Sequence, residues 1–443
     1  MKRILILFVL ISNFIMAQHT IKGVFSPPEE FRVAVLYKVT PTISEYITHA
    51  QVDEKGRFEI SLDSTVTKGM YRIVYAIPEE DYNFDIIYNK KEDISLTFNS
   101  ETGLKILSSS ENKLMASYNN SMSMITHSIN NFYREKSKDT TALVSIFKTQ
   151  REAQKGFEDL AKNTIALHFI KANRPYIPEH YEEAETYSKN LRIHYFDHVN
   201  FTSKTLQSSN FLNERMVNYV FGTAVDSINR DANYKKNINV FCKAMKNAPL
   251  EIKRTLLVDL WEQMRDLNYE KVANYISDTY LIDIAKSLND KELLEGLTLY
   301  KNTSIGRVAP DFSFEMKKGN SKVNTKLSEL AEAKTYIVVF WSSTCGHCLD
   351  EIPQLRDFIK TKTKEEIRVI AVGLEDEPYN WKSMTYDYPN FIHVYGAGHW
   401  DNEIGNNYGV TATPSYFILD AEKRIIAKPE DIDALIGYFK LQK

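Results

Sequence analysis

Short segments in which apolar and polar residues alternate run from about residue 20 to residue 107. Alternation with a period of two separates side chains onto the two faces of a strand, so it predicts β-structure. Turn-forming sequences such as Asp53-Glu54-Lys55-Gly56 separate the segments. We therefore predict an antiparallel β-sandwich over residues 18–109. Its expected strands cover residues 20–25, 32–39, 44–50, 57–62, 70–76, 82–88 and 93–98.

The spacing of apolar residues becomes helical between residues 110 and 300. Leu114, Tyr118, Ile125, Ile129 and Phe132 recur at intervals of three, four and seven. We predict an all-α region of about six helices, including residues 239–246 and 252–267. Aromatic residues at this spacing usually form a core, so we expect packing here and no cofactor site.

A polar stretch at residues 301–306 is suited to a linker, and beyond it strand and helix patterns alternate. The expected strands are 336–340, 367–374, 391–395, 415–419 and 424–427, and the expected helices are 345–362, 378–385 and 429–439. Several of these strands are apolar without interruption, which is typical of a sheet covered on both faces. Residues 301–443 are therefore expected to form an α/β domain.

The first residues have the pattern of an export signal. Lys2 and Arg3 precede an apolar run that ends in the small residue Ala17. A membrane anchor is the alternative, but spanning a bilayer takes about 20 apolar residues and this run is shorter. We expect cleavage after Ala17, a periplasmic location, and a soluble mature chain with no transmembrane span.

Composition narrows the function classes. The chain has 443 residues, of which 43% are apolar and 26% charged, and its formal net charge is −3. These values describe an ordinary globular protein with several domains. The near-neutral charge argues against a nucleic-acid partner, because such proteins need clustered Lys and Arg. Three cysteines in so long a chain exclude a fold held together by disulfides.

Two of the three cysteines lie together in the sequence from Trp341 to Cys348, where a predicted buried strand gives way to a helix. With Thr344 as the expected N-cap, Cys345 would lie beside the unpaired N–H groups of the first helical turn, which favour a thiolate. Cys348 follows one turn later, within reach of a disulfide. The pair could therefore attack a substrate disulfide and then resolve the mixed disulfide internally.

The cysteine pair could instead have one of three other roles. A structural zinc site needs four ligands, and the remaining cysteine, Cys242, is distant in sequence and expected to be a buried thiol. A peroxidase would carry Pro and Thr where this chain has Val338 and Ser342. An inert structural disulfide is the third alternative. We expect redox activity, with no metal and no cofactor.

The last third of the chain resembles a known family. The segments Val308-Ala309-Pro310-Asp311-Phe312, Phe340-Trp341 with the cysteine pair, and Gly409-Val410-Thr411-Ala412-Thr413-Pro414 are similar to the opening motif, active site and cis-proline loop of TlpA/ResA-like thiol–disulfide oxidoreductases. The resemblance covers residues 305–443 and implies a thioredoxin-like fold. It implies that Cys345 attacks, Cys348 resolves, Glu351 is a buried acid and Pro414 is a cis-proline. It also places Trp341, Thr413 and Pro414 at the substrate surface.

Two of these residues can be interpreted independently of the family. Glu351 lies one turn after Cys348, so a buried carboxylate there could take the proton of the resolving thiol. The alternative is an acid on a solvated helix face. Pro414 opens an apolar strand, and its lack of an N–H leaves the backbone of Thr413 free to pair with a substrate chain.

Two departures from the family pattern concern the chemistry. Many thioredoxins carry a buried Asp on the strand before Phe-Trp, whereas this chain has Val339. The residues inside the pair are Gly346 and His347, as in protein disulfide isomerases. A charged His347 would stabilise the Cys345 thiolate and make the pair more oxidising, whereas the family usually reduces its substrates.

We therefore predict an exported thiol–disulfide oxidoreductase with a redox-active disulfide, acting as a reductase on cysteine-containing exported proteins. A membrane or soluble thiol would be its electron partner. The alternative is a non-catalytic exported binding protein in which the pair is incidental. His194 and His198 have a metal-binding spacing, but no third ligand is evident, so we expect no metal there.

Overall fold

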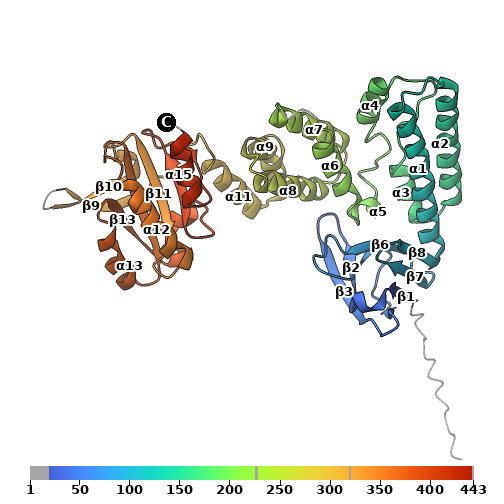
Figure 1. Cartoon of the computed structure of the whole chain (residues 1–443), viewed down its shortest axis with the longest axis horizontal. Coiled ribbons are helices and arrows are strands. Elements are labelled where there is room, and N and C mark those ends of the chain that lie inside the picture. The colour runs from blue at the N-terminus through green and yellow to red at the C-terminus, as the bar shows by residue number, and fades with distance from the viewer. Residues whose placement is uncertain (1–18, 225–227, 319–320, 442–443) are drawn as a thin grey trace, which may run out of the picture. The chain divides into compact units, whose positions relative to one another are not determined.

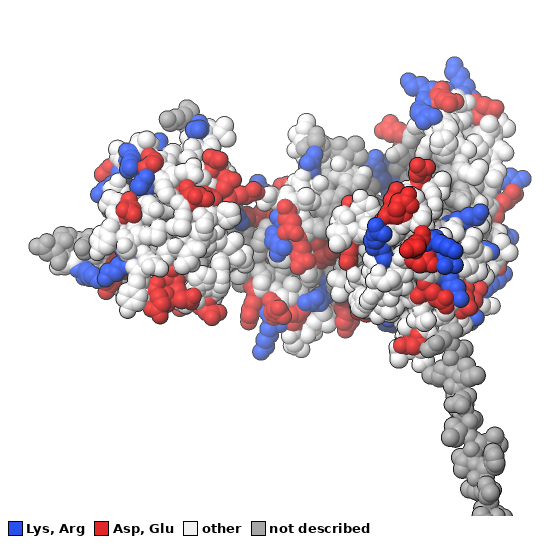
Figure 2. Space-filling view, turned by 60° about the horizontal axis from the view of Figure 1, so that its bottom comes forward, with Lys and Arg blue, Asp and Glu red and all other residues white. Residues whose placement is uncertain are grey.

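The computed structural model describes residues 19–224, 228–318 and 321–441 (Figure 1). The predicted export signal and its cleavage site lie outside the described residues. The chain divides into two compact units, the first ending at Gln263 and the second beginning at Met264. None of the described helices is long and apolar enough to cross a membrane. On the face shown in Figure 2, acidic and basic side chains lie interspersed over the first unit, as expected for a near-neutral chain.

The first unit begins with two four-stranded sheets that enclose one apolar cluster. In one sheet the strand order is β4 (Arg57–Leu62), β1 (His19–Ser26), β7 (Ile94–Asn99) and β8 (Gly103–Ser108); in the other it is β3 (Ser44–Gln51), β2 (Val33–Val39), β5 (Gly69–Val74) and β6 (Asn83–Tyr88). The prediction of a wholly antiparallel arrangement is wrong, because β1 and β7 pair in parallel. Strand β8 was not predicted, because it is an edge strand whose side chains do not alternate between buried and exposed.

The middle of the chain is helical, as predicted, with more helices than the six or so expected, and the helices predicted at 239–246 and 252–267 begin earlier, as α7 and α8. They are α1 (Ser110–Arg134), α2 (Thr140–Leu160), α3 (Ala166–Ala172), α4 (Ala184–Ile193), α5 (Lys204–Gln207), α6 (Phe211–Gly222), α7 (Arg230–Ala244), α8 (Leu250–Asp266), α9 (Glu270–Ile276), α10 (Ile282–Leu288) and α11 (Lys291–Asn302). Buried hydrogen bonds fix α1 to the sheets: the Asn112 amide accepts from the N–H of Ile87 and donates to its carbonyl, both at 2.7 Å.

The second unit is built on a five-stranded sheet, coloured orange to red in Figure 1. Its order is β13 (Phe391–Ala397), β12 (Ile367–Glu375), β11 (Thr335–Trp341), β14 (Ser415–Leu419) and β15 (Ile425–Ala427). Strands β11, β12 and β13 are parallel, and β14 and β15 are antiparallel to their neighbours. The prediction that both faces are covered is confirmed, because successive residues of β11 enter two different apolar clusters.

The helices of this unit lie around the sheet. Helices α12 (Gly346–Ile359) and α15 (Ile432–Leu441) contribute to one of the two clusters. Helices α13 (Pro378–Met384) and α14 (Glu403–Asn407) follow β12 and β13. The three central parallel strands thus lie between helices, and the cysteine pair lies where β11 ends and α12 begins.

Two segments of this unit differ from expectation. Strands β9 (Ser313–Lys318) and β10 (Ser321–Lys326) form a hairpin that was missed because most of its residues are polar. The expected linker 301–306 is packed against other elements. Ser304 is 1% exposed, and its hydroxyl accepts from the amide of Asn274, while the N–H of Ile305 donates to Glu270. Hydrogen bonds to Asn274 and Glu270 thus hold the segment against α9, and Thr303 and Ser304 are buried.

Candidate active site

The two cysteines lie where the buried strand β11 ends and α12 begins. Cys345 is the N-cap of α12, and its Sγ accepts the N–H of Cys348 at 3.4 Å. The prediction of Thr344 as the N-cap is therefore wrong. The hydroxyl of Thr344 instead pairs with that of Ser342 at 3.0 Å. The sulfur itself occupies the position at which a helix start stabilises negative charge.

Cys345 is partly exposed and favours the thiolate. Burial opposes its ionisation, but hydrogen bonds from the Cys348 thiol and from the backbone N–H groups of Cys348 and His347 hold the pKa of Cys345 below its ordinary value. The side chain of His347 is exposed to solvent. In this structure the contribution of His347 to the low pKa therefore comes from its backbone.

Cys348 has the opposite environment. Its side chain is fully buried in the cluster formed by α12, α15 and the sheet. Burial, followed by the hydrogen bond with Cys345, raises the pKa of Cys348 to about 12. Both cysteines are free thiols here. One thiol is therefore poised to attack, and the other stays protonated until something removes its proton.

The predicted proline loop lies directly against the thiol of Cys345. The Thr413–Pro414 peptide is cis, and the Cys345 thiol donates to the carbonyl of Thr413 at 3.2 Å. Both loop residues are partly exposed, so a substrate can reach them. The expectation that Trp341 contacts substrate is wrong, because this side chain is fully buried and packs edge-on against Tyr388.

Glu351 is half-buried rather than fully buried. Its Oε2 atom accepts hydrogen bonds from the Tyr416 hydroxyl at 3.0 Å and from the N–H of Ile432, at the start of α15, at 2.9 Å. These bonds contradict the alternative of an acid on a solvated helix face. The carboxylate is held inside the unit, between α12, β14 and α15.

A second acid near the pair was missed by the sequence analysis. Glu375, the last residue of β12, is 3% exposed and accepts hydrogen bonds from both the N–H and the hydroxyl of Ser343. It thereby ties the segment before Cys345 to the neighbouring strand. The available signal was a charged residue that directly follows the apolar run 367–374, at the carboxyl end of a parallel strand.

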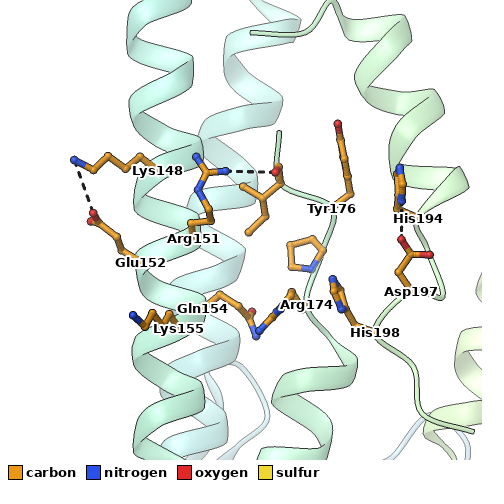
Figure 3. A pocket seen from close by; sticks show the side chains of 12 residues that line it. Lys148, Arg151, Glu152, Gln154, Lys155, Arg174, Tyr176, His194, Asp197 and His198 are labelled. Atoms are coloured by element: carbon orange, nitrogen blue, oxygen red, sulfur yellow. Dashed lines mark hydrogen bonds and ion pairs between the residues drawn. The ribbon is translucent and has the colours of Figure 1, made fainter. Parts of the chain in front are cut away.

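The first unit contains a groove of about 670 Å³ between α2 and the segments 174–177 and 194–198 (Figure 3). Its charged side chains are largely paired within the chain: Arg174 with Glu158, and His194 with Asp197 at 2.6 Å. Among the described residues, no group of three or more His, Cys, Asp and Glu could hold a metal ion. The groove shows no reactive group comparable to the thiol pair.

Comparison with known proteins gives one family match and several similar proteins. The Redoxin family model matches residues 305–432. The thiol–disulfide oxidoreductases ResA of Bacillus thuringiensis (strain Al Hakam) and Bacillus anthracis are each 24% identical over 160 residues, covering 33% of this chain and 86% of theirs.

Solved structures are also similar. The thioredoxin domain of a thiol–disulfide oxidoreductase from Bacteroides vulgatus is 20% identical, covering 31% of this chain and 97% of that one, with a TM-score of 0.28. A thioredoxin-like protein from Bacteroides caccae is 18% identical, covering 61% and 98%, with a TM-score of 0.32. The family match, the ResA relatives and the thiol pair at the strand–helix junction agree. Residues 305–432 therefore match the Redoxin family, and this part of the chain is similar to the ResA thiol–disulfide oxidoreductases.

Proposed function

We propose that this chain is an exported, periplasmic reductase of disulfides in cysteine-containing exported proteins, and that it works through Cys345 and Cys348. The observation that carries the proposal is the contrast between the two thiols. Cys345 is partly exposed with a lowered pKa, whereas Cys348 is fully buried with a raised one. Attack requires an accessible thiol that ionises easily, and resolution requires a second thiol that stays protonated until the mixed disulfide has formed.

The reaction is proposed to run in two exchanges. The Cys345 thiolate attacks one sulfur of the substrate disulfide, and the other substrate sulfur leaves as a thiolate that takes a proton. Cys348 then loses its proton and attacks Cys345, which forms the Cys345–Cys348 disulfide and releases the second substrate thiol. The substrate gains two electrons and two protons, and the pair is oxidised. A membrane-bound or soluble thiol partner then reduces the pair again.

The proline loop is proposed to hold the substrate chain. The backbone of Thr413 lies beside the attacking sulfur, and Pro414 next to it has no N–H to donate. A substrate segment pairing with Thr413 would bring its disulfide to Cys345. Glu351 is the proposed acceptor of the Cys348 proton. The two N-terminal sheets, which we propose form a β-sandwich, and the helices that follow are proposed to select the partner.

The reduction potential of the Cys345–Cys348 couple tests the direction of exchange. The full chain carrying Cys242→Ala would be equilibrated in glutathione or dithiothreitol buffers and its oxidised fraction measured by mass. A potential near about −270 mV supports a reductase, and one near about −120 mV contradicts it in favour of an oxidase. A pair that exchanges with neither buffer would favour the non-catalytic binding protein.

A further inference from the structure

Tyr416 bonds to the acid Glu351 and packs in the same apolar cluster as Cys348. It is 2% exposed and shares the apolar cluster of Cys348. Its hydroxyl donates to Glu351 Oε2 at 3.0 Å. Burial, followed by the nearby charges of Glu351 and Cys348, raises the pKa of Tyr416, so the phenol stays protonated and keeps donating.

The position of Tyr416 in the sheet suggests a role for its hydrogen bond with Glu351. Its cross-strand partner is Val339, the residue that stands where many thioredoxins carry a buried Asp. A valine cannot take a proton. Val339 and Tyr416 lie side by side in one apolar cluster, and the Tyr416 hydroxyl bonds to the carboxylate of Glu351, which comes from α12.

Resolution needs a proton acceptor at this place. The pKa of Cys348 is raised to about 12, so the thiolate is scarce near neutral pH. Glu351 is fixed by two donors, the Tyr416 hydroxyl and the N–H of Ile432. Two donors on one oxygen hold the carboxylate in a single orientation, which a half-exposed glutamate would otherwise not keep.

We propose that Tyr416 is a positioning residue that holds Glu351 for deprotonation of Cys348, in place of the acid that Val339 does not supply. The inference rests on the proposed function. As Cys348 attacks the mixed disulfide on Cys345, its proton passes to the Glu351–Tyr416 pair and ends on the carboxylate. The S–S bond between Cys345 and the substrate breaks, and the substrate sulfur leaves with the electron pair and is protonated by solvent.

The test is Tyr416→Phe in the full chain, which removes the hydroxyl and keeps the ring. Reduced protein would be mixed rapidly with a disulfide-linked peptide, quenched with acid, and resolved by mass into free, mixed-disulfide and oxidised forms. The matched control is Tyr408→Phe, since Tyr408 is equally buried on the other face of the sheet and donates to the carbonyl of Pro310 at 2.8 Å.

We expect Tyr416→Phe to slow resolution at pH 7 by about tenfold or more and to leave the attack rate within about twofold. Tyr408→Phe should leave both rates near those of the parent. The ionisable groups around the tyrosine are Cys348 and Glu351 of α12 and Asp431 before α15. Resolution in the variant should then depend on hydroxide and rise about tenfold per pH unit from pH 6 to 9, while the parent changes less.

The outcomes separate the inference from the function on which it rests. If the parent forms no mixed disulfide, the proposed function fails. If the parent completes both steps and Tyr416→Phe resolves at the parent rate with the parent pH profile, the positioning role alone fails. Glu351→Gln is the second variant: combined with Tyr416→Phe it should add little further slowing, because the two residues act as a unit. Independent, multiplying effects would contradict the pairing.

Discussion

At the scale of single residues, the two cysteines differ because of where each lies on α12. Cys345 occupies the N-cap and receives backbone N–H groups, whereas Cys348 lies one turn deeper in an apolar cluster. Position along one helix thus gives two chemically identical side chains opposite pKa shifts, as the proposed attacking and resolving roles require.

This contrast predicts selective alkylation. With Cys242→Ala, the full chain keeps only Cys345 and Cys348. Iodoacetamide at pH 7 should modify Cys345 at least about tenfold faster, because its pKa is lowered while that of Cys348 is raised to about 12. Peptide mass spectrometry over time gives both rates. Comparable rates for the two thiols, after unfolding in urea has confirmed that both can react, would contradict the assignment.

His347 can be tested with two substitutions that remove different groups. His347→Pro removes both the imidazole and the backbone N–H that lowers the pKa of Cys345, whereas His347→Ala removes the imidazole alone. We expect the proline variant to raise the Cys345 pKa and to move the couple toward a more reducing potential, by on the order of 30 mV. The alanine variant should shift less. An equal shift in both variants would assign the effect to the imidazole instead.

At the scale of elements, the sequence pattern predicts some strands fully and others not at all. Residues 57–62 and 415–419 are found as β4 and β14 with the predicted bounds, because turn residues flank a clear pattern of burial. The hairpin β9–β10 is polar and therefore gives no apolar periodicity. The parallel pairing of β1 with β7 joins distant segments, and no local pattern encodes it.

The candidate site likewise contains features that the sequence predicts and features that it does not. The cysteine pair is a local motif that could be identified from its spacing, and the proline loop was identified from its resemblance to the family motif. The burial of Trp341, the sulfur as N-cap and the bonds of Glu351 to β14 and α15 depend on tertiary packing. Contacts between elements that are distant in sequence leave no trace in the spacing of residues.

Glu375 ties two elements together, and its removal should loosen the segment before Cys345. Glu375→Gln replaces one acceptor oxygen by an amide that cannot accept from Ser343, so we expect a loss of about 1–3 kcal/mol in the free energy of unfolding. Urea denaturation of the full chain measures it. The control is Glu332→Gln, an acid that is 46% exposed and paired with Arg368, for which less than about 1 kcal/mol is expected. Equal losses of unfolding free energy in the two variants would contradict the role of Glu375 in holding the segment before Cys345.

At the scale of the whole molecule, the chemistry lies in the second unit, and the first unit is the proposed source of partner selection. The proposed export would decide which partners the chain can meet. Expressed with its own first residues in a Gram-negative host, the chain should yield a mature form that begins at Gln18 and fractionates with periplasmic proteins. The intact mass of the purified chain and the mass of its N-terminal peptide show whether residues 1–17 have been removed. A chain that retains residues 1–17 and sediments with membranes would contradict cleavage.

The most direct test of the central claim is the covalent intermediate itself. Full-length Cys348→Ala, mixed with an excess of a disulfide-linked peptide, should accumulate a mixed disulfide on Cys345 that dithiothreitol removes, because no second thiol can resolve it. Cys345→Ala should accumulate far less, since the remaining thiol is buried and has a raised pKa. Intact mass spectrometry counts the adducts. No adduct on Cys348→Ala, or equal adducts on both variants, would contradict the account of Cys345 as the attacking thiol and Cys348 as the resolving one.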